Sequence, residues 1–556
     1  MITISVYGGA RSIGGNKILL EDGDARVFFD FGTSFKVRER YYEEYLKPRP
    51  GTGLLDLLEM EFGEREKGLY YGSLLPRLEG LYRKDLEPAG DVWSRFRERA
   101  DYRRLEDVAG VLVSHAHIDH TGYLSFLRPE IAVYCSAMTA FIAKAMQVSG
   151  IAEFEKEVCY TTPREQTEGE GPLRSAKDWR RVPHIQRPFA LVDGEGLGEE
   201  ARRFWNEKPG SGRNLKVAEA VADASRVGGL RARAFPVDHS VYGACAWAVE
   251  TSVGWVVYTG DLRVHGSRSE ATRRFIEEAR KLRPRALLCE GTRVGELEAR
   301  GHERTEATEA DVAENALAEV RGVEGLVVAD FGPRNVERLE TFLGVARECG
   351  RKLVILAKDA YMLDAMRLVS GEVASVGSED DLLIYKDLKV EPQHWEKKLR
   401  GEVEGVRGYP DRFVTGAQVA ESQGDFILCF SFWDVKNLID IEPEGGKYIY
   451  SSSEVYSEDQ GIDIGRLRNW LAHFGLEHRG LPYQEEDGSW GTDPDHPGLH
   501  ASGHAASGDI MELVREIRPE TVLPIHTEQP EAFVEEMRGE DIEVRVPEYG
   551  EAVELS

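Results

Sequence analysis

The feature that most constrains this chain is a short apolar segment that runs directly into a cluster of histidines. Val111, Leu112 and Val113 have the length and β-branched content of a buried strand, and the residues from His115 to His120 read His-Ala-His-Ile-Asp-His. Three imidazoles and a carboxylate within six positions are the nitrogen and oxygen donors that zinc or manganese prefers, whereas calcium requires more oxygen. Because the end of a strand is held rigidly, the pattern predicts a metal site there.

The composition limits the class of protein. A length of 556 residues predicts two to four structural units. With 70 basic and 98 acidic residues, the net charge of −28 argues against a basic surface that wraps nucleic acid, but it is compatible with a locally positive cleft. No apolar run is long enough to cross a membrane, the first residues do not resemble a signal peptide, and the six cysteines form no CxxC pair. We expect a cytoplasmic protein with reduced cysteines and no membrane association.

Strand signals and glycine turns occupy the beginning of the chain and return after residue 229, which predicts one unit over residues 1–300. Two segments interrupt this unit. Residues 36–106 are rich in Arg, Glu, Tyr and Leu, and we expect a helical insertion that packs on the surface or, alternatively, a lid. Residues 151–228 are polar and rich in glycine, as flexible loops beside a cleft are.

The hydrophobic period changes after residue 301. A strand over 325–331, a helix over 336–349 and a strand over 352–357 alternate as they do in a parallel α/β unit. We place this inserted unit at 301–445, and we expect residues 446–556 to return to the first unit.

Polar residues follow several later strands at the point where each strand ends. His239, Asp261, Glu290 and His526 all occupy such positions. Any one of them alone would be read as an ordinary buried or surface polar residue. Their joint occurrence after the histidine cluster predicts that they converge on it.

These residues and their order resemble the metallo-β-lactamase superfamily and, within it, the ribonuclease J-like group of the β-CASP nucleases. The β-CASP label rests on Glu290 in Cys-Glu-Gly-Thr, His504 in Ser-Gly-His-Ala and His526 in Pro-Ile-His. The resemblance implies an α/β fold, an αββα sandwich with an inserted α/β β-CASP domain. The two insertions are longer than this group predicts, and the sequence ends too soon after His526 for the group's C-terminal domain.

The resemblance also implies the ligands of two divalent metal ions, which we expect to be Zn²⁺, with Mn²⁺ as the alternative. It assigns His115, His117 and His239 to one metal, and Asp119, His120 and His526 to the other, with Asp261 bridging the two. Such a pair of metals would activate water for attack on a phosphodiester, so no serine or cysteine nucleophile is needed.

Further residues are expected around the metals. We expect catalytic roles for Asp119, Glu290 and His504, and phosphate binding by His500, Ser502, Gly503 and His504. His504 could bind phosphate or protonate the leaving group, and Glu290 could orient an imidazole or transfer protons.

Three other positions have supporting roles in this scheme. Asp30 is expected to hold the backbone of the histidine loop, and Asp238 to orient a ligand imidazole. Arg334 and Asn335 lie where a strand of the insert meets the next helix, so they could contact phosphate or simply cap that helix.

The sequence therefore predicts a metal-dependent ribonuclease that acts on single-stranded RNA as an exonuclease, an endonuclease or both. A DNA nuclease of the same superfamily is the nearest alternative, and a small-molecule metallo-hydrolase is a second. A non-catalytic scaffold would have lost ligands, but all seven are present. The sequence leaves open whether the chain forms a homodimer.

Overall fold

The structure is a computed structural model that describes residues 1–43, 45–64, 69–88, 90–169, 171–210, 212–295, 307–332, 334–452, 458–484, 490–491, 493 and 495–556. The boundary expected between residues 300 and 301 lies outside the described residues. Within the described residues, no helix is both long and apolar enough to cross a membrane.

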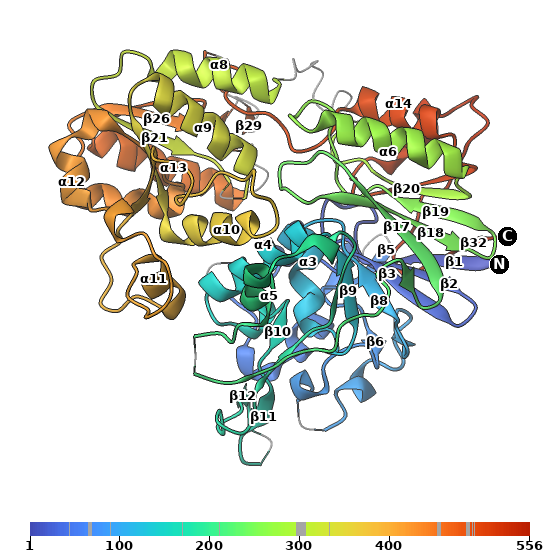
Figure 1. The fold of residues 1–556 in the computed structure, drawn as a ribbon. Coiled ribbons are helices and arrows are strands. Elements are labelled where there is room, and N and C mark those ends of the chain that lie inside the picture. The colour runs from blue at the N-terminus through green and yellow to red at the C-terminus, as the bar shows by residue number, and fades with distance from the viewer. Residues whose placement is uncertain are drawn as a thin grey trace.

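Two seven-stranded sheets lie face to face in the first unit (Figure 1). The first sheet has, in spatial order, β14 (Phe189–Leu191), β9 (Ala132–Cys135), β8 (Gly110–Leu112), β3 (Ala25–Phe29), β2 (Ile18–Asp22), β1 (Ile2–Val6) and β32 (Ala552–Leu555). The second has β16 (Arg226–Val227), β17 (Leu230–Pro236), β18 (Cys245–Thr251), β19 (Gly254–Tyr258), β20 (Ala286–Glu290), β30 (Thr521–Ile525) and β31 (Glu543–Val544). Apolar side chains such as Phe29, Leu112, Trp247 and Leu288 fill the space between the sheets.

Helices cover the outer face of each sheet. Those on the second sheet are α6 (Ser269–Leu282), α14 (Ser507–Ile517) and α15 (Pro530–Glu536). On the first sheet, α4 (Ala137–Ser149) packs together with apolar residues of the segment 36–106. The layers are therefore helix, sheet, sheet and helix, which confirms the predicted αββα sandwich.

The two segments that interrupt the first unit consist of short elements. Residues 36–106 contain α1 (Phe35–Arg38), α2 (Leu55–Glu59), β4 (Glu61–Glu64), β5 (Leu69–Ser73), β6 (Leu78–Glu79), β7 (Arg103–Arg104) and 3₁₀ turns. Residues 151–228 contain β10 (Tyr160–Thr161), β11 (Arg164–Gln166), β12 (Leu173–Ser175), β13 (His184–Gln186), α5 (Glu199–Asn206) and β15 (Leu215–Lys216). They also contain β14 and β16, so this segment adds an edge strand to each of the two sheets.

A third seven-stranded sheet forms the inserted unit. Its parallel strands are β24 (Phe413–Val414), β23 (Leu382–Tyr385), β22 (Lys352–Leu356), β25 (Phe426–Cys429), β21 (Leu326–Asp330), β26 (Gly446–Tyr450) and β27 (Leu476–Arg479). One face carries α8 (Glu309–Val320), α9 (Val336–Glu348), α10 (Ala357–Arg367) and α11 (His394–Leu399). The other face carries α12 (Gly416–Glu421), the 3₁₀ helix η10 (Phe432–Asp440) and α13 (Glu458–His473).

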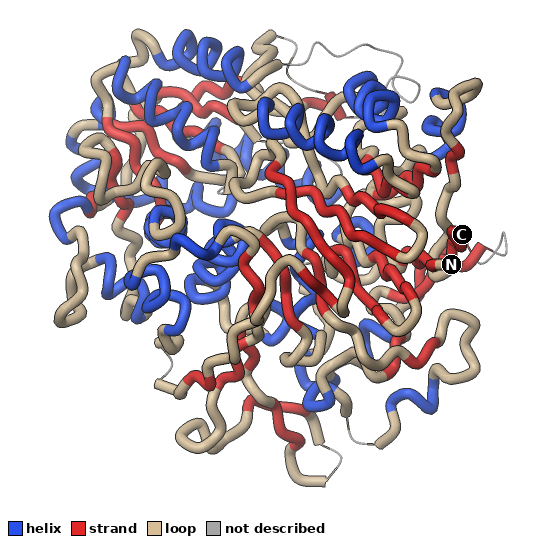
Figure 2. Tube along the Cα trace, turned by 45° about the vertical axis from the view of Figure 1, so that its right-hand side comes forward, coloured by secondary structure: helices blue, strands red, loops and turns tan. Residues whose placement is uncertain are grey.

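The predicted end of the insert at residue 445 is wrong. Strand β26 pairs with β21 in parallel, and β27 pairs with β26, so both belong to the third sheet. The chain returns to the second sheet only with β30. The insert also packs on the first unit, because apolar residues of α10 share a core with Met138 and Ile142 of α4. Figure 2 shows the helices of the chain in blue and its strands in red.

Two buried carboxyl groups at the carboxyl edge of the third sheet make its stability depend on pH. Burial raises the pKa of Asp330 and of Asp359 to about 7. At these two residues the folded chain therefore binds more protons than the unfolded chain between about pH 4 and pH 7, so their contribution to the free energy of unfolding falls as the pH rises through this window. We expect Asp359→Asn to raise the free energy of unfolding at pH 8 by on the order of 2 kcal/mol, with little change at pH 4. Urea unfolding at both pH values checks this, and an equal effect at the two values would contradict it.

Candidate metal centre

The histidine cluster forms a loop between β8 and the short helix α3 (Ile118–Thr121). Its backbone is held from outside: the amides of Gly15, Phe31 and Thr33 donate to the carbonyls of Asp119, His120 and Ile118 at 2.9, 2.9 and 3.1 Å. A Cβ atom at Gly32 would lie 1.7 Å from the Asp119 carbonyl oxygen. Only glycine permits this close approach, which fixes the loop against the end of β3.

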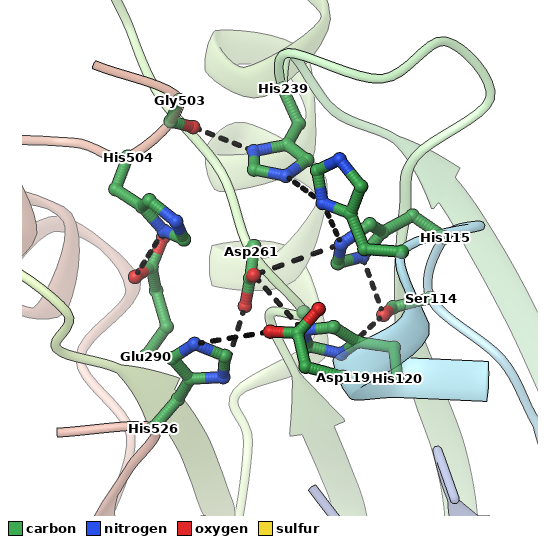
Figure 3. Close-up of polar contacts among 12 residues, drawn as sticks. Ser114, His115, Asp119, His120, His239, Asp261, Glu290, Gly503, His504 and His526 are labelled. Atoms are coloured by element: carbon green, nitrogen blue, oxygen red, sulfur yellow. Dashed lines mark hydrogen bonds and ion pairs between the residues drawn. The ribbon is translucent and has the colours of Figure 1, made fainter. Parts of the chain in front are cut away.

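The predicted metal ligands converge at the ends of the strands and fall into two groups (Figure 3). One group contains His115, His117 and His239, and the other contains Asp119, His120, Asp261 and His526. In each group, one donor atom per residue lies within 4.8 Å of the others.

Asp261 lies between the two groups. Its Oδ2 is 3.7 Å from His115 Nε2 and 3.0 Å from His120 Nε2. Its Oδ1 is buried and accepts no hydrogen bond from the described residues, and His526 Nδ1 lies 3.5 Å from it. A buried carboxylate oxygen without a partner costs free energy unless a cation or donor occupies the space beside it.

Four imidazoles are oriented through their Nδ1 atoms. Those of His115 and His120 contact Ser114 Oγ at 3.0 Å and Asp30 Oδ2 at 2.6 Å. Those of His239 and His526 contact the Gly503 carbonyl at 2.6 Å and Asn16 Oδ1 at 3.2 Å. The Nε2 atoms of His115, His120 and His239 face the centre, whereas His117 presents Nδ1, which is 3.0 Å from His115 Nε2. Such partners fix the tautomer and the direction of a metal-binding imidazole.

Asp30 connects several of the residues that orient the imidazoles. Its Oδ1 accepts the backbone amide of Ser114 at 2.7 Å, and its Oδ2 accepts the Ser114 hydroxyl, also at 2.7 Å, and the Tyr258 hydroxyl. Asp30 has a φ of 52°, and His526 also has a φ of 52°. Left-handed backbone at two non-glycine residues is strained and persists only where the surrounding structure imposes it.

The charges of the two groups differ. Burial lowers the pKa of His115 and His239, and burial with the nearby Arg334 lowers that of His117 to about 3, so the first group is neutral. Burial also opposes the charged form of His120, but Asp261, Asp119 and Asp30 outweigh it and raise its pKa.

His504 pairs with Glu290 beside Asp261. Its Nδ1 is 3.1 Å from Glu290 Oε2, and burial, which opposes protonation, is outweighed by Glu290, so the pKa of His504 is raised to about 9. Glu290 also accepts the backbone amide of Leu262 at 2.8 Å and the hydroxyl of Thr292 at 2.8 Å. These contacts place Glu290 as the residue that holds His504.

The loop before His504 contributes backbone contacts. The Gly503 carbonyl holds His239, and a Cβ atom at Gly503 would lie 2.9 Å from Ser240 Oγ. Ser502 Oγ accepts the backbone amide of His504 at 3.1 Å. His500 lies apart from this cluster: its described hydrogen bond is to the Ser451 carbonyl, at the end of β26.

Asp238 has a different partner from the one expected. Its Oδ1 lies 3.3 Å from Arg263 Nε, and the Gly503 carbonyl, not Asp238, orients His239. The sequence gives the adjacency of Asp238 and His239 but not the direction of either side chain, and in the fold the two contact different partners.

Arg334 and Asn335 have separate roles. The Asn335 side chain accepts the backbone amide of Arg338 at 3.1 Å, so Asn335 caps α9. The Nη1 atom of Arg334 is buried and has no hydrogen-bond partner among the described residues. Its guanidinium interacts electrostatically with His117 and Asp119 of the histidine loop.

Sequence reasoning did not identify Asn16, Ser114, Tyr258 and Arg263. Asn16 follows two glycines with positive φ, which is a turn signal but gives no indication of a partner more than 500 residues away. The other three residues are ordinary in sequence. They become part of the site only through the fold.

The donor set fits divalent metal ions. Five imidazoles and two carboxylates converge, the Nδ1 atoms of four of the imidazoles contact other residues, and Asp261 Oδ1 is buried without a hydrogen bond from the described residues. Nitrogen and carboxylate donors of this kind suit zinc. Beside them, His504 and Arg334 supply positive charge for an anionic ligand.

Comparisons with known proteins agree with this reading. A family model described as a beta-lactamase superfamily domain matches residues 89–171, and one described as a Zn-dependent metallo-hydrolase RNA specificity domain matches residues 496–547. A solved structure described as a protein of unknown function from Enterococcus faecalis V583 shares the fold, with a TM-score of 0.59 and 21% identity over 99% of both chains. The chain is therefore a metallo-β-lactamase-fold protein.

The chain is also similar to curated proteins of one kind, ribonuclease J. Ribonuclease J of Mycolicibacterium smegmatis is 22% identical over 433 residues, or 76% of this chain and 59% of the relative. Ribonuclease J of Sinorhizobium meliloti is 21% identical over 450 residues, or 77% of this chain and 59% of the relative. The chain spans about 59% of the length of these relatives. Within this fold, the chain is therefore similar to ribonuclease J over about three quarters of its length.

Proposed function

We propose that this chain is a ribonuclease that hydrolyses RNA phosphodiester bonds with two divalent metal ions, for which Zn²⁺ suits the donor set best. The observation that carries the proposal is the convergence of seven donor residues, in two groups that share Asp261, next to a histidine–glutamate pair. His115, His117 and His239 would hold one ion, and Asp119, His120 and His526 the other. When bound, such ions polarise a phosphoryl oxygen and lower the pKa of a water molecule.

Other residues of the chain would contact the phosphate, donate a proton or orient the metal ligands. Because Glu290 holds Nδ1 of His504, the Nε2–H of His504 is free to donate to a phosphate oxygen or to the leaving oxygen. Arg334, whose Nη1 is buried without a partner, would provide a second positive contact from the insert. Asp30, Ser114 and Asn16 would keep the imidazoles in one orientation as substrate exchanges.

RNA is the favoured substrate for two reasons. The segment that resembles an RNA specificity domain, residues 496–547, supplies both His504 and His526. The curated relatives that the chain matches are all ribonucleases by name. DNA remains the alternative, because a phosphodiester presents the same groups in both polymers and only the 2′-hydroxyl separates them.

The test is to incubate the zinc-loaded full chain with 5′-labelled single-stranded RNA and DNA of one sequence, each with and without a 5′-phosphate. We expect cleavage of RNA, with a chelator abolishing it. Cleavage of DNA alone would change the assigned substrate from RNA to DNA. The lengths of the labelled products would distinguish an exonuclease from an endonuclease. Hydrolysis of a lactam or thioester with neither polymer cleaved would overturn the proposal in favour of a small-molecule hydrolase.

A further inference from the structure

A buried arginine contacts two loops of the metal centre at once. Arg263 has no exposed side-chain surface. Its Nε lies 3.3 Å from Asp238 Oδ1, and its Nη1 donates to the Ser502 carbonyl at 3.3 Å. Asp238 and Ser502 are the neighbours of His239 and Gly503, the hydrogen-bonded pair that orients one ligand imidazole. The guanidinium therefore holds both sides of that pair.

The other contacts of Arg263 come from the insert. Its Nη1 lies 2.9 Å from Glu309 Oε1, at the start of α8, and its Nη2 lies 2.5 Å from Glu337 Oε2, in the first turn of α9. Glu337 Oε1 also accepts the backbone amide of Ser267 at 2.8 Å. Two helices of the insert are thus tied to the segment that begins at Asp261.

Helix α9 makes a second contact with the first unit, close to His239. Glu340, one turn after Glu337, accepts the hydroxyl of Tyr242 at 2.7 Å. Tyr242 lies three residues after His239, on the loop whose other side carries Asp238. The His239 loop is therefore held at two points by the insert, one of them through Arg263.

A neighbouring arginine provides the comparison. Arg338 is equally buried and shares Glu309, which lies 3.0 Å from its Nε. Its remaining contacts are with Ser451 and the Leu499 carbonyl, at the start of the loop that leads to His504. None of its described contacts is with Asp238 or Ser502. The two arginines thus share burial and a carboxylate partner, and they differ in whether they contact Asp238 and Ser502, the neighbours of the His239–Gly503 pair.

Burial of these charges is costly unless every partner is present. A guanidinium removed from water requires close carboxylates and carbonyls, and loss of one partner leaves an uncompensated charge. The arrangement of Arg263 is consequently rigid. Any displacement of α8 or α9 relative to the first unit would move Asp238 and Ser502 with it.

We propose that Arg263 is a positioning residue through which the inserted domain sets the geometry of the metal centre at His239. The proposal rests on the metal centre proposed above. By this proposal the insert takes part in metal binding, although none of the seven proposed ligands belongs to it.

The experiment compares Arg263→Met with Arg338→Met in the full chain. Metal-free protein is titrated with Zn²⁺ against a chromophoric chelator, and unfolding is followed in parallel. We expect both variants to lose stability, but only Arg263→Met to bind Zn²⁺ more weakly, by about 10–100-fold. With RNA, Arg263→Met should lower kcat more than it raises KM. Equal Zn²⁺ affinity in the two variants would overturn the proposal.

Milder variants cover the case in which Arg263→Met does not fold. Glu337→Gln keeps the shape of the side chain and removes one charge, and Arg263→Lys keeps the charge and loses the fork of donors. We expect both to weaken Zn²⁺ binding, and unchanged binding in both would overturn the proposal. The Zn²⁺ titration uses no RNA. A wild-type chain that binds Zn²⁺ but cleaves no RNA would therefore refute the proposed ribonuclease activity and leave the positioning role of Arg263 intact.

Discussion

Replacement of Asp261 by Asn should lower the bound metal below the wild-type amount and nearly abolish RNA cleavage. Asp261 is the one carboxylate that approaches a histidine of each group, at 3.7 Å from His115 Nε2 and 3.0 Å from His120 Nε2. An amide keeps the size but presents one neutral oxygen, so it is a much weaker ligand for both ions. Since a metal contributes several kcal/mol to the transition state, we expect a loss in kcat/KM of roughly 10³-fold.

The measurement is metal content by mass spectrometry after dialysis, together with the rate of RNA cleavage. Asp380→Asn is a matched control, because the Asp380 side chain is 90% exposed and pairs only with Arg412 among the described residues. Asp261→Asn protein that retained the wild-type metal content would contradict the bridging role.

Replacement of His504 by Ala should slow RNA cleavage while both metals stay bound. His504 pairs with Glu290 and lies beside Asp261, with its ring 5.2 Å from that of His239 and 5.9 Å from that of His526. A group in that position can donate a proton or a hydrogen bond to a reacting phosphate, and removal of such a group typically costs about 10²–10⁴-fold. We expect a loss within this range, mainly in kcat.

Two further variants test whether the effect is specific to the role of His504 beside the reacting phosphate. Glu290→Gln should reproduce part of the loss, because His504 would keep its place but lose its carboxylate partner. The exposed His473 should tolerate Ala without effect. His504, Glu290 and Asp261 could themselves hold a metal, so the disappearance of metal in His504→Ala would reassign His504 from phosphate chemistry to ligation.

Much of the metal centre could be predicted from sequence because ligands at strand ends have local signals. The motif from His115 to His120 follows an apolar strand, and His239, Asp261 and His526 each follow another. Parallel and neighbouring strands bring such positions to one edge, so the order of the motifs already indicates convergence.

The residues around the ligands could not be predicted in the same way. Asn16 contacts His526, and Tyr258 contacts Asp30, through pairings that only the completed sandwich creates. Arg263 resembles any other arginine until α8 and α9 surround it. The orientation of a ligand depends on these tertiary contacts, which have no period in the sequence.

The wrong boundary at residue 445 has a physical reason as well. Strand β26 is a short apolar strand that follows a glycine turn, as a strand of the first unit would be. Its pattern indicates a buried strand but not which sheet receives it. Only the parallel pairing of β26 with β21 assigns it to the insert.

The placement of β30 next to β20 has a consequence for the order in which this chain folds during synthesis. Strand β20 ends at Glu290, its partner β30 begins at Thr521, and the whole third sheet lies between them. Since synthesis runs from the N-terminus, His115, His239 and Asp261 emerge from the ribosome long before His504 and His526 can join them. A nascent chain therefore contains only part of the proposed metal centre until His526 has emerged, and the pairing of distant strands makes completion slow.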